Sequence, residues 1–157
     1  MTTTDFLTPS GVQIRQSPDV PNFTSDAIAL ANFVTCKRTD TVIDIGCGTG
    51  VISLIIGANH NPAHIIAVDI DPHATKLTAE NFALNNMTNT QTHTADIREF
   101  HKFPFVGRGG TRKASDGVGS FSNTADVIVC NPPYFTTGQQ SPSRARAIAR
   151  RVPQYAK

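Results

Sequence analysis

A glycine-rich turn between two apolar segments constrains the fold of this 157-residue chain more than any other feature. Residues 41–46 read Thr-Val-Ile-Asp-Ile-Gly, a run typical of a buried strand, and residues 51–59 are apolar enough for a buried helix. Gly46, Gly48 and Gly50 lie between them. Glycine tolerates the backbone of a tight turn and lets the main chain approach a ligand closely. The pattern predicts a strand, a turn and a helix, with a ligand site at the turn.

The alternation of strand and helix continues along the chain. Apolar strands are predicted at residues 64–70 and 126–131, and a more polar one, suited to a sheet edge, at 90–97. Ser25 or Asp26 is expected to cap one helix. Another helix is expected to start at Asp71-Pro72, an acid that can cap and a proline suited to the first turn. Apolar strands joined through helices predict an α/β fold with a mostly parallel sheet and helices on both faces.

The whole chain, residues 1–157, is expected to form a single domain. Residues 1–24 contain three prolines and a glycine around a short alternating stretch, which predicts a strand and a loop. Residues 107–124 are rich in glycine and serine, and we expect a flexible loop there.

The overall composition is that of a soluble globular protein, with 39% hydrophobic and 17% charged residues. No apolar run approaches the roughly 20 residues that span a bilayer, and no leader is visible, so we expect a cytoplasmic protein without membrane contact. Three scattered cysteines give no metal-ligand spacing, so we expect free thiols and no metal site. Residues 141–157 carry four arginines, one lysine and no acid, which suits a polyanion or a solvated helix end equally.

Acidic residues follow the predicted strands. Asp69 ends the second strand, 19 residues after Gly50, where its carboxylate could accept hydrogen bonds from ribose hydroxyls. A nicotinamide-dinucleotide fingerprint would need glycine or alanine where Val51 stands. A glycine turn without a ligand remains open as well, and Asp71 is better explained as a helix cap than as a ribose ligand.

The Gly-x-Gly-x-Gly turn, with Asp44 two residues before it, resembles the first motif of the class I S-adenosylmethionine-dependent methyltransferases. The resemblance implies a Rossmann-like fold with S-adenosylmethionine as cofactor. It also implies that Asp96 binds the exocyclic amine of the cofactor adenine and that Ile97 packs on the ring, although Asp96 could instead cap a helix. The implied cofactor-binding residues are Asp44, Gly46, Gly48, Gly50, Asp69, Asp96, Ile97 and Asn131.

The last predicted strand ends in Asn131-Pro132-Pro133-Tyr134, whose prolines stop any regular structure. This tetrapeptide resembles the motif of methyltransferases that act on amino groups. The Asn131 side chain and the Pro132 carbonyl can accept the two N–H bonds of a planar amine and so orient its nitrogen lone pair. Tyr134 offers a ring on which a flat substrate can stack. We therefore expect Asn131, Pro132 and Tyr134 to be the catalytic residues, and a turn without function is the alternative.

The motif is shared by adenine methyltransferases of nucleic acids and by those that modify a glutamine of peptide-release factors. Residues 143–147, Ser-Arg-Ala-Arg-Ala, and the segment 14–34 resemble the bacterial tRNA(Val) adenine-N6-methyltransferases. This resemblance implies tRNA as the partner and an adenine of the anticodon loop as the substrate. The arginines at 144, 146, 150 and 151 would then hold phosphates, which predicts salt-sensitive binding.

The same family carries three more strands after the Asn-Pro-Pro-Tyr motif. We therefore expect a partial methyltransferase domain that lacks the C-terminal strands, with the strand at 126–131 along an open edge. A homo-oligomer or a partner chain could cover that edge. A truncated, non-catalytic remnant that binds the cofactor or RNA is the alternative, as is a methyltransferase of a release-factor glutamine.

Overall fold

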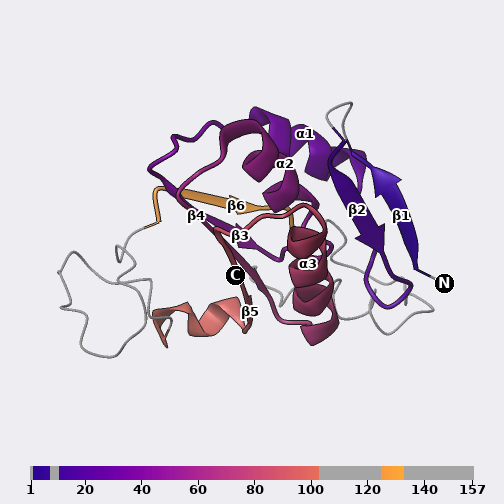
Figure 1. The fold of residues 1–157 in the computed structure, drawn as a ribbon. Helices are drawn as coiled ribbons and strands as arrows, with labels where there is room; N and C mark the ends of the chain where they lie inside the picture. The colour runs from indigo at the N-terminus through magenta and orange to yellow at the C-terminus, as the bar shows by residue number, and fades with distance from the viewer. Residues whose placement is uncertain (1, 8–10, 103–124, 133–157) are drawn as a thin grey trace.

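The computed structural model describes residues 2–7, 11–102 and 125–132 (Figure 1). In chain order the elements are β1 (Thr3–Phe6), β2 (Gln13–Gln16), α1 (Ser25–Phe33), β3 (Thr41–Ile45), α2 (Val51–His60), β4 (His64–Asp69), α3 (Pro72–Leu84), β5 (Thr90–Thr94), the 3₁₀ segment η1 (Ile97–Lys102) and β6 (Val127–Cys130). The predicted loop at 107–124, Tyr134 and the basic segment at 141–157 lie outside the described residues.

The main sheet is parallel, as the sequence predicts, with the strand order β5-β4-β3-β6. Val42, Ile43, Asp44 and Ile45 of β3 pair with Val127–Cys130 of β6 on one side. The other side of β3 pairs with β4, which in turn pairs with the polar β5 at the edge. Because all four strands run in one direction, their carboxyl ends emerge along the same edge of the sheet.

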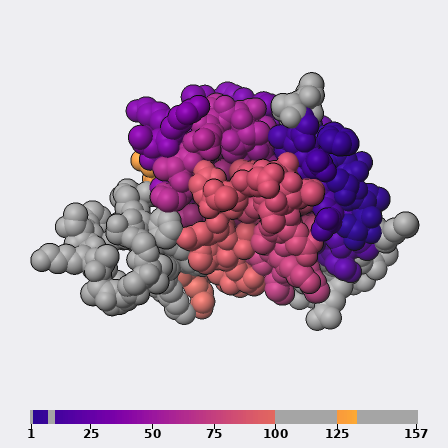
Figure 2. Space-filling model, viewed as in Figure 1, coloured from indigo at the N-terminus to yellow at the C-terminus, as the bar shows by residue number. Residues whose placement is uncertain are grey.

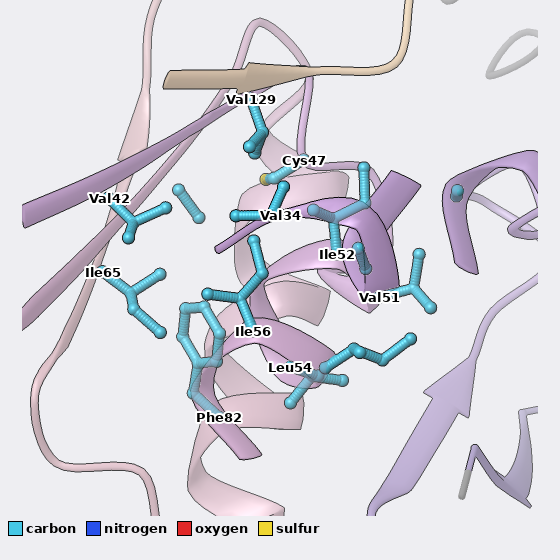
Figure 3. Packing of buried hydrophobic residues seen from close by; sticks show 14 of the residues in the cluster. Val34, Val42, Cys47, Val51, Ile52, Leu54, Ile56, Ile65, Phe82 and Val129 are labelled. Carbon is cyan, nitrogen blue, oxygen red and sulfur yellow. The ribbon is translucent and has the colours of Figure 1, made fainter. Parts of the chain in front are cut away.

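The three described α-helices pack on one hydrophobic cluster with inward-facing residues of the strands. The first two turns of α2 are buried, and Leu54, Ile55 and Ile56 are completely buried between α1 and the sheet. Figure 3 shows Leu54 and Ile56 of α2 and Phe82 of α3 in the same cluster as Val42 and Ile65 of the sheet. Among the described residues, no helix is long and apolar enough to cross a membrane.

A second cluster lies among the strand residues Ile43, Ile66 and Val68, which are at most 1% exposed. The partly buried Ile45, Ala95 and Ala125 pack against it, and α1, α2 and α3 contribute nothing to it. Within the described part of the chain, the α-helices therefore cover one face of the sheet, and the predicted helices on the other face stay a prediction.

The N-terminal segment forms an antiparallel hairpin, because β1 pairs with the predicted strand β2. β1 was not predicted, since its residues are all exposed and carry no apolar alternation. β2 packs along α3, and the indigo N-terminal residues lie directly beside the α3 surface in Figure 2. The hairpin is therefore attached to the rest of the fold mainly through α3.

Three predicted element ends can be compared with the structure. Asp71 caps α3, because its Oδ1 accepts a hydrogen bond from the His73 N–H at 2.9 Å. The predicted cap of α1 is wrong, because the helix begins at Ser25 and its cap residue is therefore Thr24, whose side chain makes no capping bond, rather than Ser25 or Asp26. The third strand is also shorter than predicted and ends at Thr94 rather than at Asp96 or beyond.

The register of β6 against β3 is secured at its beginning by Asp126. The Asp126 N–H donates to the Thr41 carbonyl at 3.0 Å, and the Thr41 N–H donates to Asp126 Oδ2 at 2.8 Å. Replacing Asp126 by alanine leaves the buried Thr41 N–H without this acceptor, at a cost of about 1–3 kcal/mol. We expect Asp126→Ala to lower the free energy of unfolding by about that amount in urea denaturation, whereas Asp126→Asn, which keeps an acceptor oxygen, loses less. Equal stability of Asp126→Ala and wild type would contradict this assignment.

Candidate functional site

The glycine turn connects β3 to α2 and is hydrogen-bonded to the neighbouring strand β4. Gly46, Gly48 and Gly50 all have positive φ, between 55° and 80°, a conformation that residues with a side chain rarely adopt. The N–H groups of Gly46 and Cys47 both donate to the Val68 carbonyl, at 2.8 and 3.1 Å. A Cβ placed on Gly46 or Gly48 would meet no atom of the described residues within 4 Å, so among these residues nothing covers the main chain of the turn.

The third glycine answers a different requirement. A Cβ on Gly50 would lie 2.8 Å from Cγ2 of Thr78 on α3, which is too close for a carbon–carbon contact. The Thr78 hydroxyl also donates to the Gly48 carbonyl at 3.0 Å. Gly50 therefore lets α3 close against the turn, whereas Gly46 and Gly48 leave room for a ligand.

Asp44 is a completely buried carboxyl at the base of the turn. Its Oδ2 accepts a hydrogen bond from the Ser53 hydroxyl on α2 at 2.7 Å, while the buried Oδ1 has no partner within the described part of the chain. Burial raises the pKa of Asp44 to about 6, the bonds from Ser53 oppose this rise, and the charge of Asp69 adds to it. A buried oxygen without a donor is costly, and a ligand that supplies a donor would remove that cost.

Asp69 joins the end of β4 to the turn. Its Oδ2 accepts from the Gly48 N–H at 2.9 Å and its Oδ1 from the Asp71 N–H at 3.0 Å. Burial raises the pKa of Asp69, and these two backbone N–H groups offset part of the rise. Each carboxylate oxygen accepts more than one hydrogen bond, so Asp69 retains capacity for the hydroxyls of a ribose.

Asp96 directly precedes η1, and its carboxylate is hydrogen-bonded by Arg98 two residues later. Asp96 Oδ1 accepts from the backbone N–H of Arg98 and from its Nε, both at 2.9 Å, and Oδ2 accepts from the guanidinium as well. These hydrogen bonds lower the pKa of Asp96 to about 2. In this structure Asp96 therefore has the capping role that the sequence left open, and an adenine amine would have to share the carboxylate with Arg98.

Two isoleucines follow the acids at this edge. Ile97, which the sequence analysis singled out, is 40% exposed, and Ile70, directly after Asp69, is 51% exposed. Single exposed apolar side chains are normal on a protein surface, so their exposure does not by itself indicate a ligand, but a flat apolar ring bound beside Asp69 and Asp96 would cover them.

The Asn131-Pro132 corner leaves the sheet immediately beside the glycine turn. Ile45 is the register partner of Cys130, so Gly46 and Asn131 are the next residues on two adjacent strands. Neighbouring strands are about 4.8 Å apart. The structure therefore brings the two motifs together, which sequence separation alone could not establish. Of the three predicted catalytic residues, Asn131 and Pro132 are described, and Tyr134 lies outside the described residues.

S-adenosylmethionine, which the resemblance implies as cofactor, fits the residues at this edge. Asp44 offers an unpartnered buried oxygen for a donor, the turn offers open space over Gly46 and Gly48, and Asp69 offers acceptors for ribose. The three cysteines are free thiols, as predicted, and burial raises the pKa of Cys47 and Cys130, with Asp44 adding to both rises. Neither thiol is thus activated as a nucleophile.

Some supporting residues were missed from the sequence. Ser53 holds Asp44, and Asn81 on α3 donates to the Thr49 carbonyl of the turn at 2.9 Å. Both are polar residues in helix faces that are otherwise buried, which is the signal that could have identified them.

The raised pKa of Asp44 predicts a pH-dependent stability. Because the folded-state pKa of about 6 lies above the ordinary value of 3.8, the folded chain binds this proton more tightly than the unfolded chain. Protonation of Asp44 therefore raises the free energy of unfolding as the pH falls from about 6 toward 4. Above pH 7, the buried charge lowers the free energy of unfolding by on the order of 3 kcal/mol. We expect Asp44→Asn to be more stable than wild type at pH 8, by on the order of 1–3 kcal/mol, with a difference that shrinks toward pH 4.

Thermal unfolding between pH 4 and 8 measures this difference, and subtracting the two curves removes the contribution of Asp69. Ser53→Ala is the matched control, because losing the hydroxyl raises the pKa of Asp44 further and moves the transition to higher pH. Parallel pH profiles for wild type and Asp44→Asn would show that Asp44 is not the titrating group.

Comparison with known proteins relates this site to a family. The model of the ribosomal protein L11 methyltransferase (PrmA) family matches residues 28–132, which include the glycine turn, Asp69, Asp96 and Asn131. In fold, the chain is similar to the solved M. jannaschii TYW2 in complex with AdoMet, with a TM-score of 0.51, 19% identity, and coverage of 62% of this chain and 45% of that one.

Two curated relatives carry different names. A tRNA1(Val) (adenine(37)-N6)-methyltransferase of Aliivibrio salmonicida is 29% identical over 126 residues, 80% of this chain and 46% of that protein. A Methanocaldococcus jannaschii protein with the provisional name of protein N5-glutamine methyltransferase is 35% identical over 130 residues, 82% of this chain and 54% of that protein. The chain thus spans about half the length of the curated relatives it matches. The α/β fold, the position of the turn and the family match agree: the chain belongs to the PrmA family, whose model matches residues 28–132, and thus to the S-adenosylmethionine-dependent methyltransferases.

Proposed function

We propose that this chain carries the cofactor and amine sites of an N-methyltransferase that modifies the exocyclic amino group of adenine in tRNA. The single observation that carries the proposal is that Gly46 and Asn131 directly follow Ile45 and Cys130, the last register partners of the paired strands β3 and β6. A methyl donor on the turn and an amine at the corner would then meet at one edge of the sheet.

The residues have complementary tasks in this proposal. Asp44, Asp69 and the open main chain at Gly46 and Gly48 would hold S-adenosylmethionine, which supplies a methyl group on a positively charged sulfur. The Asn131 side-chain oxygen and the Pro132 carbonyl would accept the two N–H bonds of the amine and turn its lone pair toward that methyl group. As the nitrogen–carbon bond forms, the sulfur–carbon bond breaks and the sulfur leaves as a neutral thioether. The nitrogen then loses a proton to water, so no strong base is required.

An adenine in tRNA is favoured by the names of several relatives, among them proteins of Aliivibrio salmonicida and Vibrio vulnificus at about 30% identity. The composition of residues 141–157, basic and without an acid, suits the same partner. A second candidate is a glutamine side-chain amide in a protein, which the more similar M. jannaschii relative favours by its name. The primary amide presents the same pair of N–H bonds on a planar nitrogen, so the corner alone does not separate the two.

Methyl transfer from labelled S-adenosylmethionine tests the proposal. We expect label in unmodified tRNA and N6-methyladenosine after nuclease digestion. Label in the glutamine of a release factor, with tRNA unlabelled, would favour the second candidate. S-adenosylhomocysteine binding in calorimetry with no labelled acceptor would instead identify a cofactor-binding remnant and contradict the proposal.

Asn131→Ala tests the amine site separately. We expect the rate of transfer to fall by about 10²–10³-fold, because one preorganised acceptor is lost at the reacting nitrogen. The affinity for S-adenosylhomocysteine should remain close to that of wild type. Cys130→Ala is the matched control, since this exposed neighbour lies on the same strand without either proposed role. Full activity in Asn131→Ala would refute the assignment.

A further inference from the structure

Asn81 of α3 and Asn85, the residue directly after the helix, bind the backbone of β2 in the way that a neighbouring strand would. Asn85 accepts from the Gln13 N–H at 2.9 Å and donates to the Gln13 carbonyl at 2.7 Å. One helical turn earlier, Asn81 accepts from the Arg15 N–H at 2.7 Å and donates to the Arg15 carbonyl at 3.0 Å. The four-residue spacing on α3 thus matches the two-residue spacing of a strand face.

Asn81 differs from Asn85 in a third contact. Its amide nitrogen also donates to the Thr49 carbonyl in the glycine turn at 2.9 Å, while the third contact of Asn85 goes to the Asn81 carbonyl in α3 itself. Asn81 is completely buried, and both of its N–H donors are used. One side chain therefore connects the turn to the N-terminal hairpin.

The surroundings leave Asn81 little freedom to move. On the turn side, the Thr78 hydroxyl donates to the Gly48 carbonyl. On the hairpin side, Val20 packs on Ala74 and Leu77, so the chain after β2 follows α3 toward the carboxyl edge of the sheet. Removing the Asn81 amide would leave the buried Thr49 carbonyl and the partly buried N–H and carbonyl of Arg15 without this partner, and rearranging either side to pair them would move the other.

We propose that Asn81 is a positioning residue of the cofactor site, coupling the main-chain geometry of the turn to the docking of the N-terminal hairpin. The inference rests on the proposed cofactor site, and it adds that binding at the turn and ordering of β2 favour each other. Such coupling is reciprocal, so a ligand at the turn must stabilise the contact at Arg15.

Variants at the two asparagines separate coupling from stability. We expect Asn81→Ala to weaken S-adenosylhomocysteine binding about tenfold, equivalent to about 1.4 kcal/mol, in titration calorimetry. Asn85→Ala removes the same kind of contact to the same strand but leaves the Asn81 bond to Thr49 in the turn, so it should weaken binding by less than Asn81→Ala does. Equal losses of affinity in the two variants would show that the Asn81 bond to the turn adds nothing beyond docking of the hairpin and would overturn the role proposed for Asn81.

Hydrogen exchange of the unmodified chain gives a test that does not depend on a variant folding. Saturating S-adenosylhomocysteine should slow exchange of the Gly48 amide in the turn and of the Arg15 amide in β2. Slower exchange at Gly48 with an unchanged Arg15 amide would overturn the coupling while leaving the cofactor site intact. No binding, with no change at Gly48, would overturn the cofactor site and the inference together.

Discussion

The parallel pairing of β3 with β4 on one side and β6 on the other is the constraint on which the site depends. This pairing sends the glycine turn, Asp69 and Asn131 out of the sheet at one edge, although up to 85 residues separate them in the chain. Asp126 fixes the start of β6 against Thr41, and the four register pairs that follow place Asn131 beside Gly46.

The same edge contains groups that are unfavourable for folding. Asp44 is buried with one oxygen that has no partner among the described residues, and the turn fixes three glycines, which lose more backbone freedom on folding than any other residue. Such features persist where the surrounding structure holds them and a ligand repays their cost. Here Ser53, Thr78 and Asn81 supply the holding contacts from α2 and α3. The unpartnered Asp44 oxygen and the open main chain of the turn therefore indicate the same ligand-binding surface as the family resemblance.

Much of this arrangement was predictable, because it is written in local patterns. Continuous apolar runs predict the parallel strands, Asp71-Pro72 predicts the start of α3, and the glycine spacing predicts the turn. The missed features depend on tertiary contacts: β1 has no apolar pattern, and the Asn81 amide gains its role only because β2 lies beside α3. Asp96 was ambiguous for a related reason, since its partner Arg98 is a local competitor for any ligand. Tyr134 and the C-terminal arginines stay predictions.

The central claim, one shared edge for donor and amine, is tested most directly by amide chemical shifts during titration with S-adenosylhomocysteine. The account predicts concerted shifts at Gly46 and Gly48, Ile70 and Asn131, and little change at the opposite end of the strands. That opposite end has its own hollow of about 750 Å³, lined by Pro62, Asn85, Asn89 and their neighbours, where the ligand could bind instead. Shifts confined to that hollow, or to the turn with Asn131 unaffected, would contradict the account.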